Sequence, residues 1–443
     1  MVDVKLLSEI VFLFLLVWLG FNLVFRRVTV PVMFIVIYYM FSDYALYNLG
    51  YDIGELSIGK VFIEVIFLIV FIVSLSKFYE EFKFKGNIEI GKKTLSFIIF
   101  LILIPVVLVV VGSMSNGLSD AINGWRAIFL PIVLSEMLFF VSPGAAKSDK
   151  FWNEIVLTFI AIAVINSVFS IYQYVSYTGD MLDTWRYYLL LDAREIRGVS
   201  EGLNEHFLQY QIERDNNLRS SGFIVSALNA GYFTAIAMVF SFFKMTQSRG
   251  RKLVWGLISI TLFFGIYVSQ VRTALIIFMF GIIVYFWLKV FSPNRKLVVL
   301  ISILLPFLIG FISIIQGEVL DSSSQGRIIQ YENMMHDFRV LGYGLGSYLG
   351  KFDSYYIHIC MTLGIFAIIP IVYFYTRLSD LLKSEIRGDD DSILVVVSLS
   401  VILFSVFFVQ HVASSLYYFL SILLMSGFVT KFSRRNSILK EGE

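Results

Sequence analysis

Long runs of apolar residues recur along almost the whole chain, and they limit its fold more than any other feature. An α-helix that crosses a bilayer needs about 20 mostly apolar residues, and thirteen runs approach or reach that length. A soluble protein of 443 residues could not bury so much apolar surface. Here 58% of the residues are hydrophobic and 15% are charged, against about 45–50% and about 25% in soluble domains. We therefore predict an all-α polytopic membrane protein. The predicted spans, with twelve and fourteen as alternative counts, are 6–25, 28–47, 57–76, 95–112, 126–141, 152–173, 222–243, 253–269, 273–289, 297–316, 355–376, 392–410 and 412–430.

The hydropathy pattern divides the chain into five regions. No small-residue cleavage site follows the first run, so we expect that run to be a helix and not a removable signal. The single cysteine, Cys360, excludes disulfides within the chain and cysteine-only metal sites. The regions are N-terminal helices (1–175), a first long loop (176–221), central helices (222–316), a second long loop (317–354), and C-terminal helices with a tail (355–443).

The lysines and arginines predict the orientation, because short cytoplasmic loops are enriched in both residues. Six segments and the Arg26-Arg27 pair hold 23 of the 35 basic residues when placed in the cytoplasm. This arrangement puts the N-terminus and both long loops outside, and the C-terminus inside. Loops of this length are usually functional or disordered, and these contain aromatic and apolar residues. We expect short helices in them, near the membrane surface. The cytoplasmic segments are 77–93, 142–151, 244–252, 289–296, 377–391 and 431–443.

The basic residues predicted outside are mostly arginine, and the first long loop has five arginines and no lysine. A guanidinium group matches the geometry of carboxylate and phosphate, which suggests a chemical reason for this bias. The same loop carries eight acidic residues, so internal salt bridges are the alternative for Arg186, Arg194, Arg197 and Arg214. The nine external arginines are Arg126, Arg186, Arg194, Arg197, Arg214, Arg219, Arg272, Arg327 and Arg339.

Two of these arginines lie where a predicted span begins. Arg219 directly precedes one span, and Arg272 lies at the junction of two. Arginine costs about 2.5–3.5 kcal/mol at the centre of a spanning helix and less at the interface. Each side chain alone could be an anchor that reaches toward water. Two arginines at the same depth, beside two long external loops, favour a shared anion site.

A third element lies in the second long loop. Arg327 opens a predicted short helix that ends at Gly342-Tyr343-Gly344-Leu345-Gly346. Glycines at alternate positions allow positive φ and a close approach of the backbone to a ligand, although an ordinary tight turn is the alternative. Asp353-Ser354-Tyr355-Tyr356 then leads into the next span.

Three sequence elements follow one another between about residues 210 and 376. The first is Arg219-Ser220-Ser221-Gly222-Phe223 with Asn229-Ala230-Gly231, the second is Ser269 to Ala274, and the third is the Gly326-Arg327 helix with the glycine turn and Asp353 to Tyr356. Arg339 and Gly350 also fit an Arg-x10-Gly spacing. In residues, order and membrane placement these elements resemble the O-antigen polymerase and O-antigen ligase superfamily. The N-terminal half is similar in hydropathy alone.

The resemblance implies a membrane-embedded glycosyltransferase that is independent of metals and cofactors. Its implied substrates are oligosaccharides on undecaprenyl diphosphate, and the growing glycan would move from its carrier to the sugar of a new lipid-linked repeat unit. The implied place is the bacterial cytoplasmic membrane, with the active site facing the periplasm or the cell exterior. Membrane lipids and a chain-length regulator are expected partners, and nucleic acid is not.

Within this scheme we assign roles to individual residues. Arg219 and Arg272 would clamp the diphosphate, with Arg327 completing the clamp. Arginine does not deprotonate, so the attacking sugar hydroxyl needs another base. Asp353 is the first candidate, and it stands where related ligases tend to carry histidine, which argues against a ligase. The further candidates are His358, for which a packed core histidine is the alternative, and then Glu332 and His336. The expected glycan contacts are Arg339, Tyr343, Gly344 and Tyr356, with Tyr187 and Tyr188 as further stacking candidates.

Three other functions remain open. An O-antigen ligase would use the same chemistry with a lipid A core as acceptor. A flippase or transporter for lipid-linked oligosaccharide usually carries ionisable residues deep within its spans. A structural scaffold would not need external arginines. The few acidic residues in the spans lie near span ends or face other helices, and this favours an enzyme. They are Glu9, Asp43, Glu64, Glu136 and Glu154.

Overall fold

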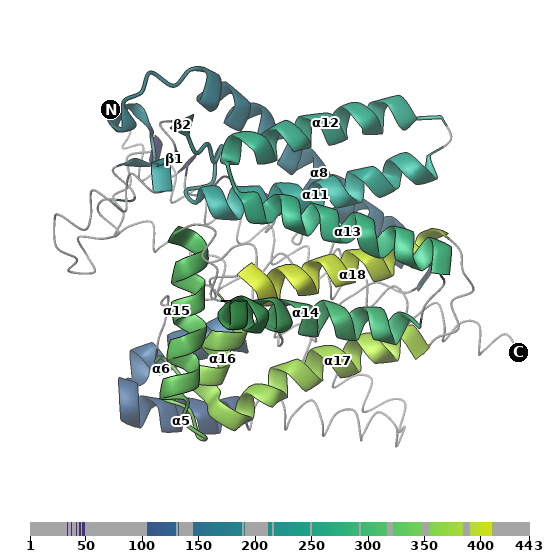
Figure 1. Ribbon diagram of the computed structural model, residues 1–443. Helices are drawn as coiled ribbons and strands as arrows, with labels where there is room; N and C mark the ends of the chain where they lie inside the picture. Colours follow the sequence, from purple (N-terminus) through teal and green to yellow (C-terminus); the bar gives the residue numbers. More distant parts are fainter. Residues whose placement is uncertain are drawn as a thin grey trace, which may run out of the picture. The chain divides into compact units, whose positions relative to one another are not determined.

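The computed structural model describes the chain in a series of ranges, and in them it is helical apart from two very short strands and the connecting turns (Figure 1). The ranges are 104–129, 145–187, 211–214, 217–248, 250–291, 294–316, 322–347, 354–383 and 390–409, with the single residues 33, 37, 41, 44, 45, 47, 48, 132 and 190.

The chain forms two compact units. Unit 1 comprises residues 1–73 and 149–280, and unit 2 comprises residues 74–148 and 281–443. The described elements up to the middle of the chain are α5 (Ile104–Asn116), α6 (Leu118–Ile128), α8 (Ala145–Val175), η2 (Met181–Asp183), β1 (Glu213–Arg214), β2 (Asn217–Leu218), α11 (Ala227–Gln247) and α12 (Lys252–Ser269). The later ones are α13 (Arg272–Phe291), α14 (Arg295–Gln316), α15 (Ser322–Asp337), α16 (Tyr355–Leu363), η3 (Gly364–Ala367), α17 (Ile368–Lys383) and α18 (Asp390–Val409).

Five of the described helical segments are long and apolar enough to cross a membrane, which makes the chain a multi-pass membrane protein. They are Asn153–Val175, Ala227–Gln247, Lys252–Ser269, Arg272–Phe291 and Tyr355–Thr376. These segments confirm the predicted spans 152–173, 222–243, 253–269, 273–289 and 355–376. Shorter apolar helices lie at Ile104–Asn116, Leu297–Ile309 and Val396–Ser405, within or overlapping three more predicted spans. The spans 6–25, 57–76 and 412–430 and most of 28–47 and 126–141 lie outside the described residues, so the count of thirteen stays a prediction.

In unit 1, α11 is the central helix and packs along α12. Its residues are buried on nearly every side, for example Phe233 and Ala235. The helix begins at Ala227, five residues later than the predicted span. Two features delay it: Gly222 has a φ of +69°, and the Ser226 hydroxyl accepts a hydrogen bond from the Asn229 N–H as an N-cap. The residues before Ala227 are therefore a loop, although they are apolar.

One face of α12 exposes a continuous row of large apolar side chains. Leu253, Leu257, Ile260, Phe264 and Tyr267 are all at least half exposed, and their spacing of three and four residues puts them on one stripe. An apolar stripe of this length fits a helix face in contact with lipid tails.

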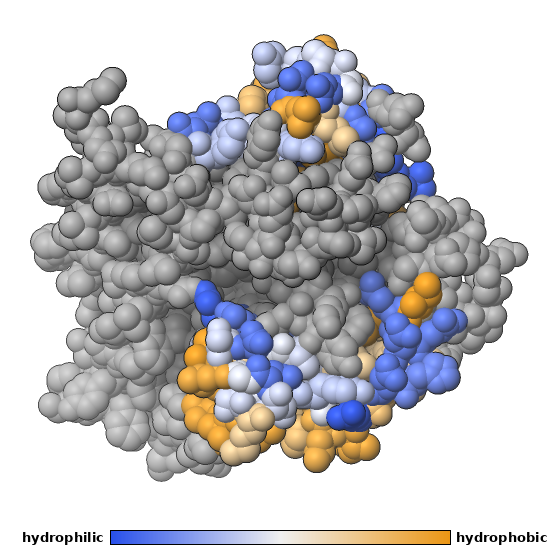
Figure 2. All heavy atoms as spheres, turned by 90° about the vertical axis from the view of Figure 1, so that its left-hand side faces the viewer, coloured by the Kyte–Doolittle hydropathy of each residue, from blue (hydrophilic) through white to orange (hydrophobic). Residues whose placement is uncertain are grey.

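Figure 2 looks onto the side that is at the left in Figure 1, and there blue hydrophilic residues lie among orange hydrophobic ones in the described parts.

In unit 2, α14 packs against α15, α17 and α18, and α16 packs against α15 and α18. The predicted span 355–376 is not one straight helix. Its α-helical run stops at Gly364, which has a φ of +57°, and continues through η3 into α17. The hydropathy of the sequence does not change at Gly364, so it does not predict this interruption. The predicted span 355–376 thus consists of two α-helices joined by a short 3-10 helix.

Close packing of α8 on α12 predicts a steric effect at Gly265. A Cβ atom on this residue would overlap the Ser167 hydroxyl and lie 2.6 Å from Ser167 Cβ. Gly265→Ala should therefore destabilise the protein by about 1–3 kcal/mol, as overpacking does. Gly256→Ala, on the same helix, is the control, because its nearest neighbour would be Met245 Sδ at 3.8 Å. Thermal unfolding in detergent measures both, and equal melting temperatures would contradict the close contact.

Candidate functional site

A polar stripe on α8 holds the first arginine-containing loop. Asn166, Ser170 and Gln173 lie three and four residues apart and so share one face of the helix. The Asn166 side chain accepts from the Phe223 N–H (2.9 Å) and donates to the Ser221 carbonyl (3.3 Å). Gln173 accepts from the Gly222 N–H (3.0 Å) and donates to the Gly222 carbonyl (3.1 Å). The loop backbone is thus fixed by side chains within an otherwise apolar span.

The loop also reaches the end of α12. The Ser220 hydroxyl donates to the Ser170 carbonyl (2.7 Å), and the Ser220 N–H donates to the Val268 carbonyl (3.0 Å). Arg219, next to it, is 1% exposed, and its N–H donates to the Ile212 carbonyl (2.7 Å). The side chain of Arg219 is therefore buried within unit 1, unlike that of an arginine that reaches toward water.

The beginning of α11 packs against the junction between α12 and α13. Gly231 leaves room for Val271, whose Cβ would lie 2.8 Å from a Cβ on that glycine. The Tyr232 and Thr273 hydroxyls are 3.0 Å apart and share a hydrogen bond. The first and second elements found in the sequence are therefore neighbours in unit 1.

Arg272 is the first residue of α13 and is exposed. Before it, Gln270 ends α12 in the left-handed region with a φ of +52°, and its carbonyl accepts a hydrogen bond from Arg214 (3.5 Å). A helix N-terminus carries a partial positive charge. The guanidinium of Arg272 lies at the same end of α13, so both positive groups are at this junction.

Arg186 is a second buried arginine of this region, and it was not among the residues predicted to bind the substrate. It is 2% exposed, and it donates to the carbonyls of Arg219 and Val225 (3.2 Å to Val225). Burial and then the positive charge of Arg219 lower the pKa of Arg186 from its ordinary value to about 9, which leaves the group protonated at neutral pH. Internal salt bridging is the alternative that the sequence offers for this residue. In the described ranges its hydrogen-bond partners are backbone carbonyls and not carboxylates.

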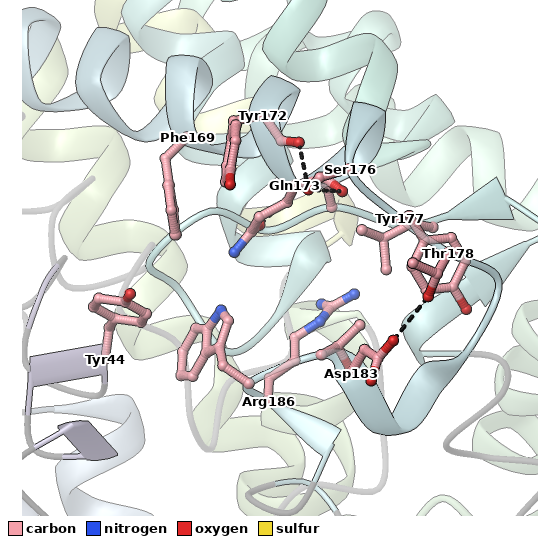
Figure 3. Close-up of a pocket in the computed structure, with 13 residues that line it drawn as sticks. Tyr44, Phe169, Tyr172, Gln173, Ser176, Tyr177, Thr178, Asp183 and Arg186 are labelled. Carbon is pink, nitrogen blue, oxygen red and sulfur yellow. Dashed lines mark hydrogen bonds between the residues drawn. The ribbon is translucent and has the colours of Figure 1, made fainter.

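Arg186 lines a pocket at the C-terminal end of α8, which Figure 3 shows in close-up. Its volume is about 230 Å³. One part of the lining is aromatic, and the other consists mainly of hydroxyl, amide and carboxylate groups. The aromatic residues are Tyr44, Phe169, Tyr172, Tyr177 and Trp185, and the others are Gln173, Ser176, Thr178, Asp183, Thr184, Arg186, Leu218 and Ser220.

In unit 2, the glycine turn takes the backbone conformation that its spacing predicted. Gly342, Gly344 and Gly346 have φ values of +71°, +87° and +94°, which confirms the expected positive φ. The close approach, however, is to other parts of the protein. A Cβ on Gly342 would lie 2.6 Å from the Gly364 nitrogen, and one on Gly346 would lie 2.7 Å from the Ala121 nitrogen. This geometry fits the alternative of a tightly packed turn.

The turn is hydrogen-bonded to the end of α16. The N–H groups of Tyr343 and Gly344 donate to the carbonyls of Met361 (2.9 Å) and Thr362 (3.0 Å). These carbonyls belong to the last turn of α16, where the helix itself offers no partner. The interruption at Gly364 thus provides the acceptors that fix the turn.

Two candidates of unit 2 lie inside α16. His358 is 2% exposed and Tyr356 is 4% exposed. The Tyr356 hydroxyl donates to the Ile303 carbonyl of α14, and its ring meets Phe307 edge-on at 5.7 Å. The placement of His358 fits a packed core histidine. The contacts of Tyr356 favour a role in holding α16 on α14.

The other candidates of unit 2 are more exposed or lie beyond the described ranges. Arg339 is exposed, and its guanidinium lies 4.1 Å from the Tyr343 ring centre, a cation–π contact. The Tyr343 hydroxyl donates to the Asp337 carbonyl (3.0 Å). Glu332 and His336 are exposed on α15, and Arg327 belongs to the same helix. Asp353, Gly350, Tyr188, Arg194 and Arg197 lie outside the described residues.

The described residues hold no group of three or more His, Cys, Asp or Glu side chains placed to bind a metal ion. Their chemistry is that of guanidinium, amide, hydroxyl and aromatic groups. In unit 1 these groups meet at one end of α8, around a loop fixed by Asn166 and Gln173. Such an arrangement can bind an anion beside a polar, ring-shaped group.

Removing the Asn166 amide should loosen the loop. Asn166→Leu leaves the Phe223 N–H and the Ser221 carbonyl without their partner, at about 1–3 kcal/mol for each buried group. We expect a lower melting temperature and faster trypsin cleavage after Arg219. Asn153→Leu is the matched control on the same helix, since Asn153 is exposed and its bond with Lys244 is at the surface. Equal protection of Arg219 in both variants would show that Asn166 does not fix the loop.

Comparison of the chain with protein-family models, with curated proteins and with solved structures found no match. The function is therefore inferred from the residues themselves and from their arrangement. What these establish is a multi-pass, helical membrane protein. In its unit 1, two buried arginines and one exposed arginine gather around the loop at the end of α8 and the α12–α13 junction.

Proposed function

We propose that the protein is a polysaccharide polymerase of the bacterial cytoplasmic membrane. It transfers a growing glycan from undecaprenyl diphosphate to the sugar of a new lipid-linked repeat unit, at the outer face of the membrane. The substrates are amphipathic, with a lipid tail in the bilayer and an anionic diphosphate at its surface. The lysine and arginine distribution supports this orientation of the loops.

One observation carries the proposal. The loop containing Arg219 is hydrogen-bonded to the end of α12 through Ser220 and Val268, directly before the junction at which Arg272 opens α13. Positive charge is therefore concentrated at the N-terminal end of the apolar helix α13. A lipid-linked diphosphate group lies at the membrane surface, where such a helix begins. Guanidinium groups bind phosphate oxygens with paired, charge-assisted hydrogen bonds.

This charge suits the chemistry of the transfer. The diphosphate is the leaving group, and negative charge develops on it as the glycosidic bond breaks. Fixed positive groups that meet developing charge are among the largest contributions to catalysis. In this scheme the exposed Arg272 binds the diphosphate, and the buried Arg219 adds positive charge from within unit 1.

The acceptor sugar needs a general base for its hydroxyl group. Asp353 remains the first candidate because it lies two residues before α16 in the sequence. His358 is the second candidate, although its burial in α16 requires that helix to move before the imidazole can reach a sugar.

A flippase for the same lipid-linked sugars is the second candidate function. The observation that favours it is the interruption of the 355–376 span at Gly364, because transporters often bind substrates at broken helices. An O-antigen ligase is the third possibility, and it differs in its acceptor. All three handle the same lipid diphosphate.

Complementation of a polymerase-null strain separates these functions. Wild type should restore a ladder of surface glycan, and Arg272→Ala should give single repeat units at equal expression, with transfer reduced by about 10²–10³-fold. Arg251→Ala is the matched control. Arg251 is exposed directly before α12, at the opposite end of that helix, and its loss should leave the ladder unchanged.

The null strain also distinguishes the alternatives. Polymer of normal length that stays on its lipid carrier indicates a ligase. Lipid-linked units that accumulate on the cytoplasmic side indicate a flippase. A full ladder with Arg272→Ala would remove this residue from the site.

A further inference from the structure

The proposed function assigns no ligand to the pocket at the end of α8. Its most unusual member is Arg186, a charged group that is 2% exposed. Burying a charge is costly unless an opposite charge or several hydrogen bonds compensate it. Two backbone carbonyls accept from this guanidinium, and the charged neighbour that lowers its pKa is another arginine. The environment is therefore one that an anion would stabilise.

The guanidinium retains donors for such an anion. It carries five N–H groups, and the Val225 and Arg219 carbonyls each take one. In Figure 3 its nitrogen atoms point into the space enclosed by the lining residues, with Gln173 above them and Thr178 and Asp183 to one side. A carboxylate or phosphate in this space would be within reach of the remaining donors.

The aromatic wall indicates a ligand with an apolar face. Trp185 is fixed by a hydrogen bond from its Nε1 to the Gly222 carbonyl (3.2 Å) and by an edge contact with Tyr44 at 5.1 Å. Tyr172 is 65% exposed, so its ring is available at the pocket. Rigid aromatic rings beside hydrogen-bonding groups suit a sugar, whose C–H groups form an apolar face and whose hydroxyls project from the ring edge.

Asp183 distinguishes between the possible anions. One of its carboxylate oxygens accepts from the Thr178 hydroxyl (2.8 Å), and the other can accept from a sugar hydroxyl. A negative charge in the same pocket repels a doubly charged phosphate more than a singly charged carboxylate. The volume of about 230 Å³ is below the roughly 300–1,000 Å³ of pockets that hold drug-sized ligands, and it suits one sugar ring.

We propose that this pocket binds a single acidic sugar residue, with the sugar carboxylate on Arg186, the ring against Trp185 and Tyr172, and a hydroxyl on Asp183. The site recognises the identity of the sugar at one position of the repeat unit. The origin of that sugar in a lipid-linked glycan rests on the proposed function, whereas the binding itself does not.

Tryptophan fluorescence of the purified full-length protein in detergent tests the proposal. Trp185 is one of six tryptophans, so a change that disappears in Trp185→Phe is assigned to the pocket. The ligands are methyl β-D-glucuronide, methyl β-D-glucoside and inorganic diphosphate. We expect saturable binding of the glucuronide, with at least tenfold weaker binding of the glucoside and of diphosphate.

Variants connect this binding to the pocket. Arg186→Gln should weaken glucuronide binding at least tenfold and remove the preference over the glucoside. Because Arg186 also holds the loop, Tyr172→Ala provides a change at an exposed side chain, and it should weaken both sugars several-fold. Tyr267→Ala is the matched control, as Tyr267 is 61% exposed on α12 and does not line the pocket.

Three results would overturn the proposal. Equal affinity for glucuronide and glucoside would show that the charge is not recognised. Tighter binding of diphosphate would make the pocket a phosphate site. Unchanged glucuronide binding in Tyr172→Ala would place the ligand elsewhere. The binding assay needs no glycosyl transfer, so the two proposals can fail separately. Glucuronide binding without ladder formation in the complemented strain would contradict the polymerase function alone. Ladder formation without glucuronide binding would contradict the proposed sugar pocket alone.

Discussion

A non-helical segment packed against an apolar helix must find partners for its backbone N–H and C=O groups, since neither lipid nor apolar side chains provide them. In unit 1 the Asn166 and Gln173 side chains meet this requirement for residues 221–223. The rest of the candidate site depends on these bonds. They fix the Ser220 backbone against α12 and the Arg219 carbonyl against Arg186. A polar pair on one helix face thereby determines where two guanidinium groups lie.

The same requirement explains the glycine turn of unit 2. Its N–H groups satisfy carbonyls that α16 leaves open at its C-terminal end, and its glycines remove the side chains that would prevent the approach. Both regions are thus loops whose backbone groups are paired with helices. In each, the functional candidates are side chains that project from a fixed backbone, and this limits the reorganisation needed when a ligand binds.

Hydropathy was sufficient to predict the class of the protein and the positions of several spans, because a bilayer selects for apolar length. Alternate glycines were sufficient to predict the positive φ values at Gly342, Gly344 and Gly346. The later start of α11 and the interruption at Gly364 escaped prediction, since both are set by local backbone geometry within apolar sequence. Arg186 escaped because its hydrogen-bond partners are backbone carbonyls, and any residue type can supply a carbonyl. The neighbouring Trp185 and Tyr187 were the available signal, as aromatic residues beside arginine are frequent in binding pockets.

The interruption at Gly364 also bears on how the protein assembles. The backbone bonds that link the glycine turn to α16 and η3 join residues between Val340 and Ile365. The other printed partner of the turn, the Asn116 side chain of α5, lies earlier in the chain. Contacts between near neighbours in sequence form faster than those between distant ones. The glycine turn and the end of α16 can therefore pair before the last helices are synthesised. Those helices would then pack onto an element that already has its final shape.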